Sequence, residues 1–170
     1  MVFPITYYNT LSTETQKILQ HHQEYIDDIT ITKKDINEIT KTYVNEYFLI
    51  KQIEELKKEP SIITQIENLQ KLYIFKNPRE IRNFLLQDIT LIEHLLDGYL
   101  AIMKVFQTGE KLELEYVIDA EENWDALTII IPSHLPIKQI IQLERELFEN
   151  WFVYIIDQVG NKLNYITKPL

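Results

Sequence analysis

The spacing of apolar residues changes near Thr108–Gly109, and this change constrains the fold more than any other feature of the chain. Before this point, hydrophobic residues recur three or four positions apart, as on one side of a helix. After it, apolar and polar residues alternate, which is typical of a half-buried strand. The pattern predicts an α+β fold: a helical region at residues 1–108 and an α+β region at residues 109–170, packed together as one unit.

The helical region contains five expected helices. They run from about Ser12 to Tyr25, from Lys34 to Glu59, from Ser61 through Leu72, from Pro78 to about Gln87, and from just after Thr90 to Phe106. Pro60 ends the long second helix, because proline lacks the N–H that a helix interior requires. Asn77 and Pro78 form a helix start, with a cap followed by proline at the first helical position. The last helix has the widest apolar face, which indicates a central position.

The region after Gly109 is expected to form a β-β-α-β-β unit preceded by the helices. Its predicted strands are Leu112 to Asp119, Leu127 to Ile131, Trp151 to Asp157 and Leu163 to Thr167, with a helix between Pro132 and Asn150. This order predicts one helix across one face of a mainly antiparallel sheet.

Four motifs in this region are shared with other proteins. They are Leu112-Glu-Leu114-Glu115, Asp119-Ala-Glu121, Leu127-Thr-Ile129-Ile-Ile131 and Phe148-Glu-Asn-Trp151-Phe152. With these motifs the C-terminal third resembles a group of uncharacterised bacterial, cyanobacterial-type proteins. The chain departs from the group at Ala120, where a turn proline is expected, and in its longer helical N-terminal part. The resemblance implies the strand–hairpin–helix fold. The group has no known activity that could be carried over, so the resemblance leaves the function open.

Composition excludes several kinds of site. The three glycines, Gly98, Gly109 and Gly160, are far apart, whereas phosphate-binding loops need closely spaced glycines. The chain has no cysteine, which excludes disulfides, thiolate zinc sites and cysteine nucleophiles. Three serines without a Gly-x-Ser-x-Gly motif disfavour nucleophilic hydrolysis. No signal peptide and no apolar run of ~20 residues is present, so we expect a cytoplasmic location, no membrane association and no cofactor.

The charge balance limits the partners. The net charge is −9, and residues 107–170 carry 5 basic and 11 acidic residues, a net charge of −6. Such a chain repels the phosphates of nucleic acids, so direct nucleic-acid binding is not expected. A basic protein partner is favoured by electrostatic complementarity.

The acidic strand has two interpretations. Glu113, Glu115 and Asp119 alternate with apolar residues and share one strand face. We favour a solvated sheet face, because an antiparallel sheet covered on one side leaves the other to water. The alternative is a metal-dependent hydrolase, in which the three carboxylates converge on a divalent cation.

The interpretation that the sequence favours is a non-enzymatic, acidic protein–protein interaction or regulatory module of a bacterial cytoplasm. Its candidate binding residues are Glu113, Glu115, Asp119 and Trp124, since an exposed tryptophan in the polar hairpin would mark a contact surface. No catalytic or metal-binding residue is assigned. The expected partner is a basic protein or a second copy, bound as a homodimer through the long helix.

Overall fold

The structure, a computed structural model, describes residues 33–58, 61–119 and 124–170. Contacts group the chain into two units, Met1–Leu49 and Ile50–Leu170. Helix α3 (Lys33–Lys57) belongs to the first unit up to Leu49 and to the second from Ile50. It matches the predicted long helix to within two residues at either end.

The predicted helix from Ser12 to Tyr25 lies outside the described residues. In the ranges that are described, no helix combines the length and the apolar character needed to span a bilayer.

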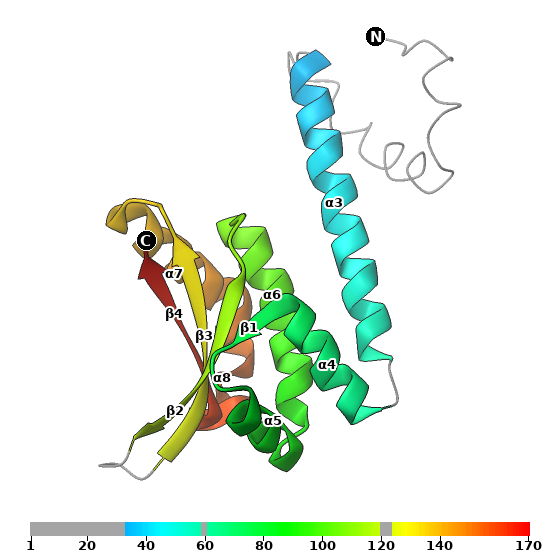
Figure 1. Ribbon diagram of the computed structural model, residues 1–170. Coiled ribbons are helices and arrows are strands. Elements are labelled where there is room, and N and C mark those ends of the chain that lie inside the picture. The colour runs from blue at the N-terminus through cyan, green and yellow to red at the C-terminus, as the bar shows by residue number, and fades with distance from the viewer. Residues whose placement is uncertain (1–32, 59–60, 120–123) are drawn as a thin grey trace. The chain divides into compact units, whose positions relative to one another are not determined.

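The second unit is a four-stranded sheet with helices packed on it (Figure 1). In chain order its further elements are α4 (Ile62–Leu72), β1 (Tyr73–Phe75), α5 (Pro78–Gln87), α6 (Thr90–Phe106), β2 (Leu112–Asp119), β3 (Trp124–Ser133), α7 (Ile137–Leu147), the π-helix η1 (Phe148–Phe152), α8 (Val153–Val159), the 3₁₀ helix η2 (Gly160–Lys162) and β4 (Leu163–Pro169). Helices and strands are both present, so the mixed class is confirmed.

Local sequence signals set several helix ends. Ser61 caps α4, and its hydroxyl oxygen accepts a hydrogen bond from the backbone N–H of Thr64 at 3.4 Å. Pro78 occupies the first turn of α5, as its fixed φ favours. Helix α6 ends at Gln107, which adopts a left-handed conformation with φ of 46°.

The strand order is β1-β2-β3-β4, and the sheet is mixed. Only the central pair, β2 and β3, is antiparallel; the pairs β1–β2 and β3–β4 are parallel. The prediction of a mainly antiparallel sheet is therefore wrong. Parallel neighbours need a long crossover, and here α5 with α6, and α7 through η2, supply the two crossovers.

The predicted strand from Trp151 to Asp157 is also wrong, because this segment is the end of η1 and the start of α8. Trp151, Phe152, Ile155 and Val159 are buried and recur at helical spacing. The bulky residues that suggested a strand thus form the apolar side of a helix.

The hydrophobic core lies between the sheet and the helices. Leu95, Leu96 and Ile102 of α6 are fully buried, which fits the predicted central position of this helix. From the sheet, the core receives buried residues of all four strands: Tyr73, Leu112, Leu114, Leu127, Ile129, Ile131 and Leu163. The core therefore joins residues from both sides of Gly109.

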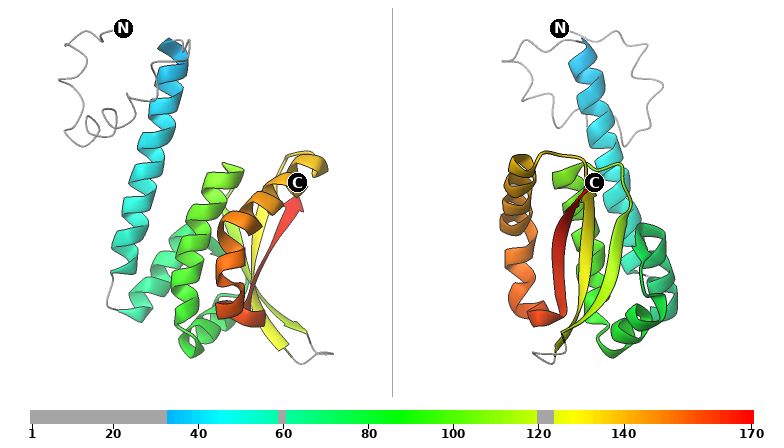
Figure 2. Two further views of the ribbon diagram at one scale, coloured as in Figure 1. Left: turned by 180° about the vertical axis from the view of Figure 1, so that it is seen from behind. Right: turned by 60° about the vertical axis from the view of Figure 1, so that its left-hand side comes forward.

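Both crossovers lie on the same face of the sheet (Figure 2), since α6 packs against α7 and η1 in one core. Because β1 and β2 run opposite to β3 and β4, two crossovers on one face must have opposite hands. One is therefore left-handed, against a preference of about 98% for the right-handed form. The result is that no described helix of the second unit covers the other face.

Candidate functional site

We call the uncovered side of the sheet the outer face, defined by the outward-facing residues of the four strands. One register row crosses the whole sheet and contains Ile74, Glu113, Ile130 and Ile166. The next row contains Glu115, Thr128 and Asn164. Ile74 and Ile166 are exposed at the two edges, whereas Ile130 is buried between its neighbours. Apolar and acidic side chains therefore share this face.

Glu113 lies near the middle of the outer face and is held by Lys76. Lys76 Nζ donates a hydrogen bond to Glu113 Oε1 at 2.7 Å, and the Glu113 side chain is 17% exposed. The second carboxylate oxygen, Oε2, is buried and accepts no hydrogen bond. Glu113 is thus ion-paired through one oxygen and unsatisfied at the other.

Glu115 lies two residues further along β2, on the same face and about 7 Å away at ~3.3 Å per residue. It is half-buried and has no ion pair within the described ranges. Asp119 follows at the end of β2, where its register partner is Trp124. The structure therefore places Glu113 and Glu115 on one sheet face, and the backbone register pairs Asp119 with Trp124 at the hairpin end of the same two strands. Trp124 begins β3 and is half-buried, so it does not lie in the hairpin loop.

This arrangement gives no support to a metal centre. Among residues 33–58, 61–119 and 124–170, no group of three or more His, Asp and Glu residues could hold a metal ion. Glu113 already forms an ion pair with Lys76, and the acids are spread along one strand, with Val117 between Glu115 and Asp119. A strand spreads such side chains in a line instead of directing them to one point.

A cluster of hydrogen-bonded polar residues lies near the hairpin end of β2. Tyr116 Oη donates a hydrogen bond to Asp125 Oδ2 at 2.6 Å, and this bond raises the pKa of Tyr116 above its ordinary value. The backbone of Tyr116 is held by Asn77: Asn77 Nδ2 donates to Tyr116 O at 2.9 Å, and Tyr116 N donates to Asn77 Oδ1 at 2.8 Å. The Asn77 amide therefore extends the β1–β2 ladder by one residue pair, and Asn77 does not cap α5 with its side chain.

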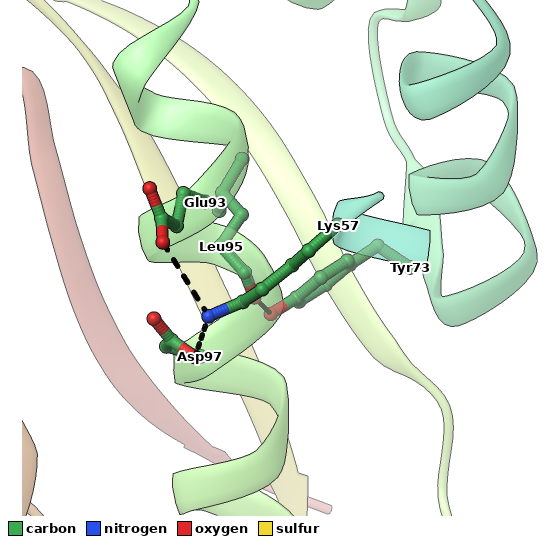
Figure 3. A network of polar contacts seen from close by, with 5 residues as sticks. All are labelled: Lys57, Tyr73, Glu93, Leu95 and Asp97. Carbon is green, nitrogen blue, oxygen red and sulfur yellow. Dashed lines mark hydrogen bonds and ion pairs between the residues drawn. The ribbon is translucent and has the colours of Figure 1, made fainter. Parts of the chain in front are cut away.

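A second cluster of charges lies between α3 and α6 (Figure 3). Lys57 Nζ donates to Asp97 Oδ1 at 2.6 Å and lies 3.6 Å from Glu93 Oε1. Nearby, Tyr73 Oη donates to the Leu95 carbonyl at 2.7 Å, and burial raises the pKa of Tyr73 well above its usual value, with Tyr99 adding to the effect. The Lys57 ion pairs join α3 to α6, and the Tyr73 hydrogen bond joins β1 to α6. Both carboxylates are paired with Lys57, so this cluster stabilises the fold.

Sequence reasoning missed the residues that flank the acids on the outer face. Ile74 belongs to the short strand β1, which gave no strand signal, and Lys76 follows directly after it. Ile166 was placed in a strand, but its neighbour in the sheet was not foreseen. The pairing of β1 with β2 brings Ile74 beside Glu113, and the pairing of β4 with β3 places Ile166 in the same register row, on the far side of Ile130.

No protein-family model, curated protein or solved structure matches the chain. The resemblance of the C-terminal motifs to a bacterial group therefore remains an expectation. The site must be interpreted from its own geometry.

Proposed function

We propose that this protein is a non-enzymatic interaction module whose outer face binds a basic segment of a partner protein. The main support is that one uncovered sheet face carries the acids Glu113 and Glu115 on β2 and has an exposed isoleucine at each edge, on β1 and on β4. Apolar contacts supply affinity at such a surface, and charges supply orientation and a fast encounter.

Glu115 is the central residue of this proposal. It is half-buried on the outer face, has no ion pair among the described residues, and lies between the Lys76–Glu113 pair and the acidic hairpin end. A lysine or arginine of the partner placed there would meet an unneutralised carboxylate. The net charge of −6 in residues 107–170 extends this attraction over a longer range.

The experiment is an NMR titration of the ¹⁵N-labelled full chain with a capped synthetic peptide in which lysine alternates with valine. The expected shifts concentrate in β2 and β3, and they weaken with added salt because exposed charges are screened. Glu115→Lys should weaken binding by roughly tenfold. Glu146→Lys makes the same charge change at an exposed position of α7 and should have little effect. Equal losses in the two variants would show that net charge alone drives binding, and the proposal would fail.

A further inference from the structure

A stripe of apolar side chains is exposed along α7 and the start of η1. It consists of Ile137, Ile141 and Phe148, which recur at helical spacing and are 68%, 52% and 39% exposed. The buried side of the same helix carries Ile140 and Leu147. The helix therefore has more apolar surface than the core of its own chain covers. We call Ile137, Ile141 and Phe148 the α7 stripe.

The α7 stripe lies near the β4 edge of the sheet. In the right-hand view of Figure 2, α7 and α8 lie beside β4, and no described strand follows β4 in the sheet. Tyr165 Oη of β4 donates a hydrogen bond to the Glu144 carbonyl of α7 at 3.2 Å. The Phe148 ring lies 6.3 Å from the Phe152 ring, which in turn lies 5.1 Å from the Tyr165 ring. Because β4 is an edge strand, another molecule can approach α7 from this side.

The backbone of β4 is a poor template for an added strand. The Tyr165 N–H already donates to Asn164 Oδ1 at 2.8 Å, and Pro169 has no N–H to donate. Lys168 also places a charge near the end of the strand, as on edges that avoid pairing. A contact at this edge is therefore expected to use the side chains of α7 and not the backbone of β4.

The charges beside the α7 stripe have opposite signs at its two ends. Lys138 follows Ile137 at the first end, and Glu149 follows Phe148 at the last. Lys138 and Glu149 are exposed, and neither forms an ion pair among the residues that the structure describes. They are about three turns apart at ~3.6 residues per turn, so they lie on the same side of the helix. A partner of one charge would be attracted at one end of the stripe and repelled at the other.

We infer that the α7 stripe binds the α7 stripe of a second copy of this chain, with the two helices antiparallel across a two-fold axis. This packing brings Ile137 near Phe148 of the partner subunit and places Ile141 close to the axis. It also brings Lys138 near Glu149 of the partner subunit, and the symmetry repeats both contacts. A parallel arrangement would instead set Lys138 against its own equivalent.

The test is analytical ultracentrifugation of the full chain, from low micromolar to near-millimolar concentration in about 0.15 M salt. Three apolar side chains from each copy form a small interface, so we expect a dimer that dissociates on dilution. Ile141→Glu should weaken this dimer by roughly tenfold, because it places two carboxylates beside the axis. Ile63→Glu, at a 66% exposed position of α4, makes the same change elsewhere and should associate like the unaltered chain. A monomer at every concentration, or equal association of Ile141→Glu and the unaltered chain, would overturn the inference.

A charge exchange tests the antiparallel arrangement. Lys138→Glu and Glu149→Lys should each weaken the dimer by roughly tenfold, because each sets like charges against one another at two places. The double variant reverses both charges and should associate like the unaltered chain. Net charge alone predicts a different result, since Glu149→Lys makes the net charge of −9 less negative and would strengthen association. Absence of recovery in the double variant would overturn the antiparallel pairing.

Discussion

The indole ring of Trp151 lies directly against the backbone of Gly98 in α6. A Cβ atom added at Gly98 would come within 2.6 Å of Trp151 Cζ2 and 2.7 Å of Cη2, closer than carbon atoms approach in proteins. Trp151 belongs to η1, which is part of the crossover from β3 to β4, so this contact packs that crossover against α6. The glycine is thus required by packing, since α6 at this position has an ordinary helical backbone.

Gly98→Ala is therefore expected to lower the free energy of unfolding by about 1–3 kcal/mol, because overpacking displaces the ring or the helix. Urea unfolding at constant m-value measures the change. Gly109→Ala is the matched control: no atom lies within 4 Å of its added Cβ, and stability should be nearly unchanged. Equal stability of Gly98→Ala and the unaltered protein would contradict the packing of Trp151 on α6.

Asn77→Ala is expected to cost about 1–3 kcal/mol, because it removes two hydrogen bonds to the Tyr116 backbone. Asn77→Asp retains the acceptor but not the donor, and should give an intermediate loss. Amide hydrogen exchange at Tyr116 should accelerate in Asn77→Ala, whereas Asn77→Asp still accepts the hydrogen bond from the Tyr116 N–H and should keep most of the protection. Asn161→Ala, in the exposed η2 segment, should leave both stability and exchange unaltered.

Lys57→Met should destabilise the second unit modestly, by about 0.5–1 kcal/mol, because the Lys57–Asp97 pair is partly exposed. The loss should shrink at high salt, and a double-mutant cycle with Asp97→Asn should show positive coupling. The adjacent Lys58 is the natural comparison: its ion pair with Glu55 is exposed and local, so Lys58→Met should change stability less. A larger effect at Lys58 would argue against the contact in Figure 3.

Asp88 provides a pH-dependent contribution to stability. Hydrogen bonds from Lys162 and then Thr90 lower its pKa below the ordinary value of 3.8. A depressed folded-state pKa stabilises the protein above pH 3.8, and this contribution disappears as the pH falls through the folded-state pKa. Asp88→Asn should therefore lower the melting temperature at neutral pH, with the difference narrowing in acid. Asp157→Asn, at an exposed acid of α8, removes the same charge without breaking a contact to Lys162 and serves as the matched control.

Helices α4 to α7 could be predicted because each carries its own local signals. Ser61 and Pro78 mark starts, and the apolar spacing of α6 identifies the buried helix. Strand β2 was accessible because its alternation continues for several residues, and β3 because of its run of β-branched residues. The three-residue β1 is too short to show a period, and the aromatic run at Trp151 fits a strand as well as a helix.

Sheet topology and the surroundings of the site could not be predicted in the same way. Whether β4 joins β3 in parallel depends on the path of the whole segment between them, which no local pattern reports. The alternation of β2 predicts that Glu113 and Glu115 share one face. It does not predict that Lys76 lies next to Glu113, because this position follows from the pairing of β1 with β2. Which strand forms the edge of the sheet likewise depends on the path of the whole chain.

The parallel pairing of β3 with β4 also determines the order in which the polypeptide can mature. During synthesis β3 is complete before α7, η1 and α8 have emerged. Its parallel partner β4 is made after them, as the last of the four described strands. Until then Leu127, Ile129 and Ile131 stand at an incomplete edge, although they are fully buried in the finished protein. Nascent chains that pause between Ser133 and Leu163 therefore present an aggregation-prone strand, and these are the chains that a ribosome-associated chaperone would be expected to hold.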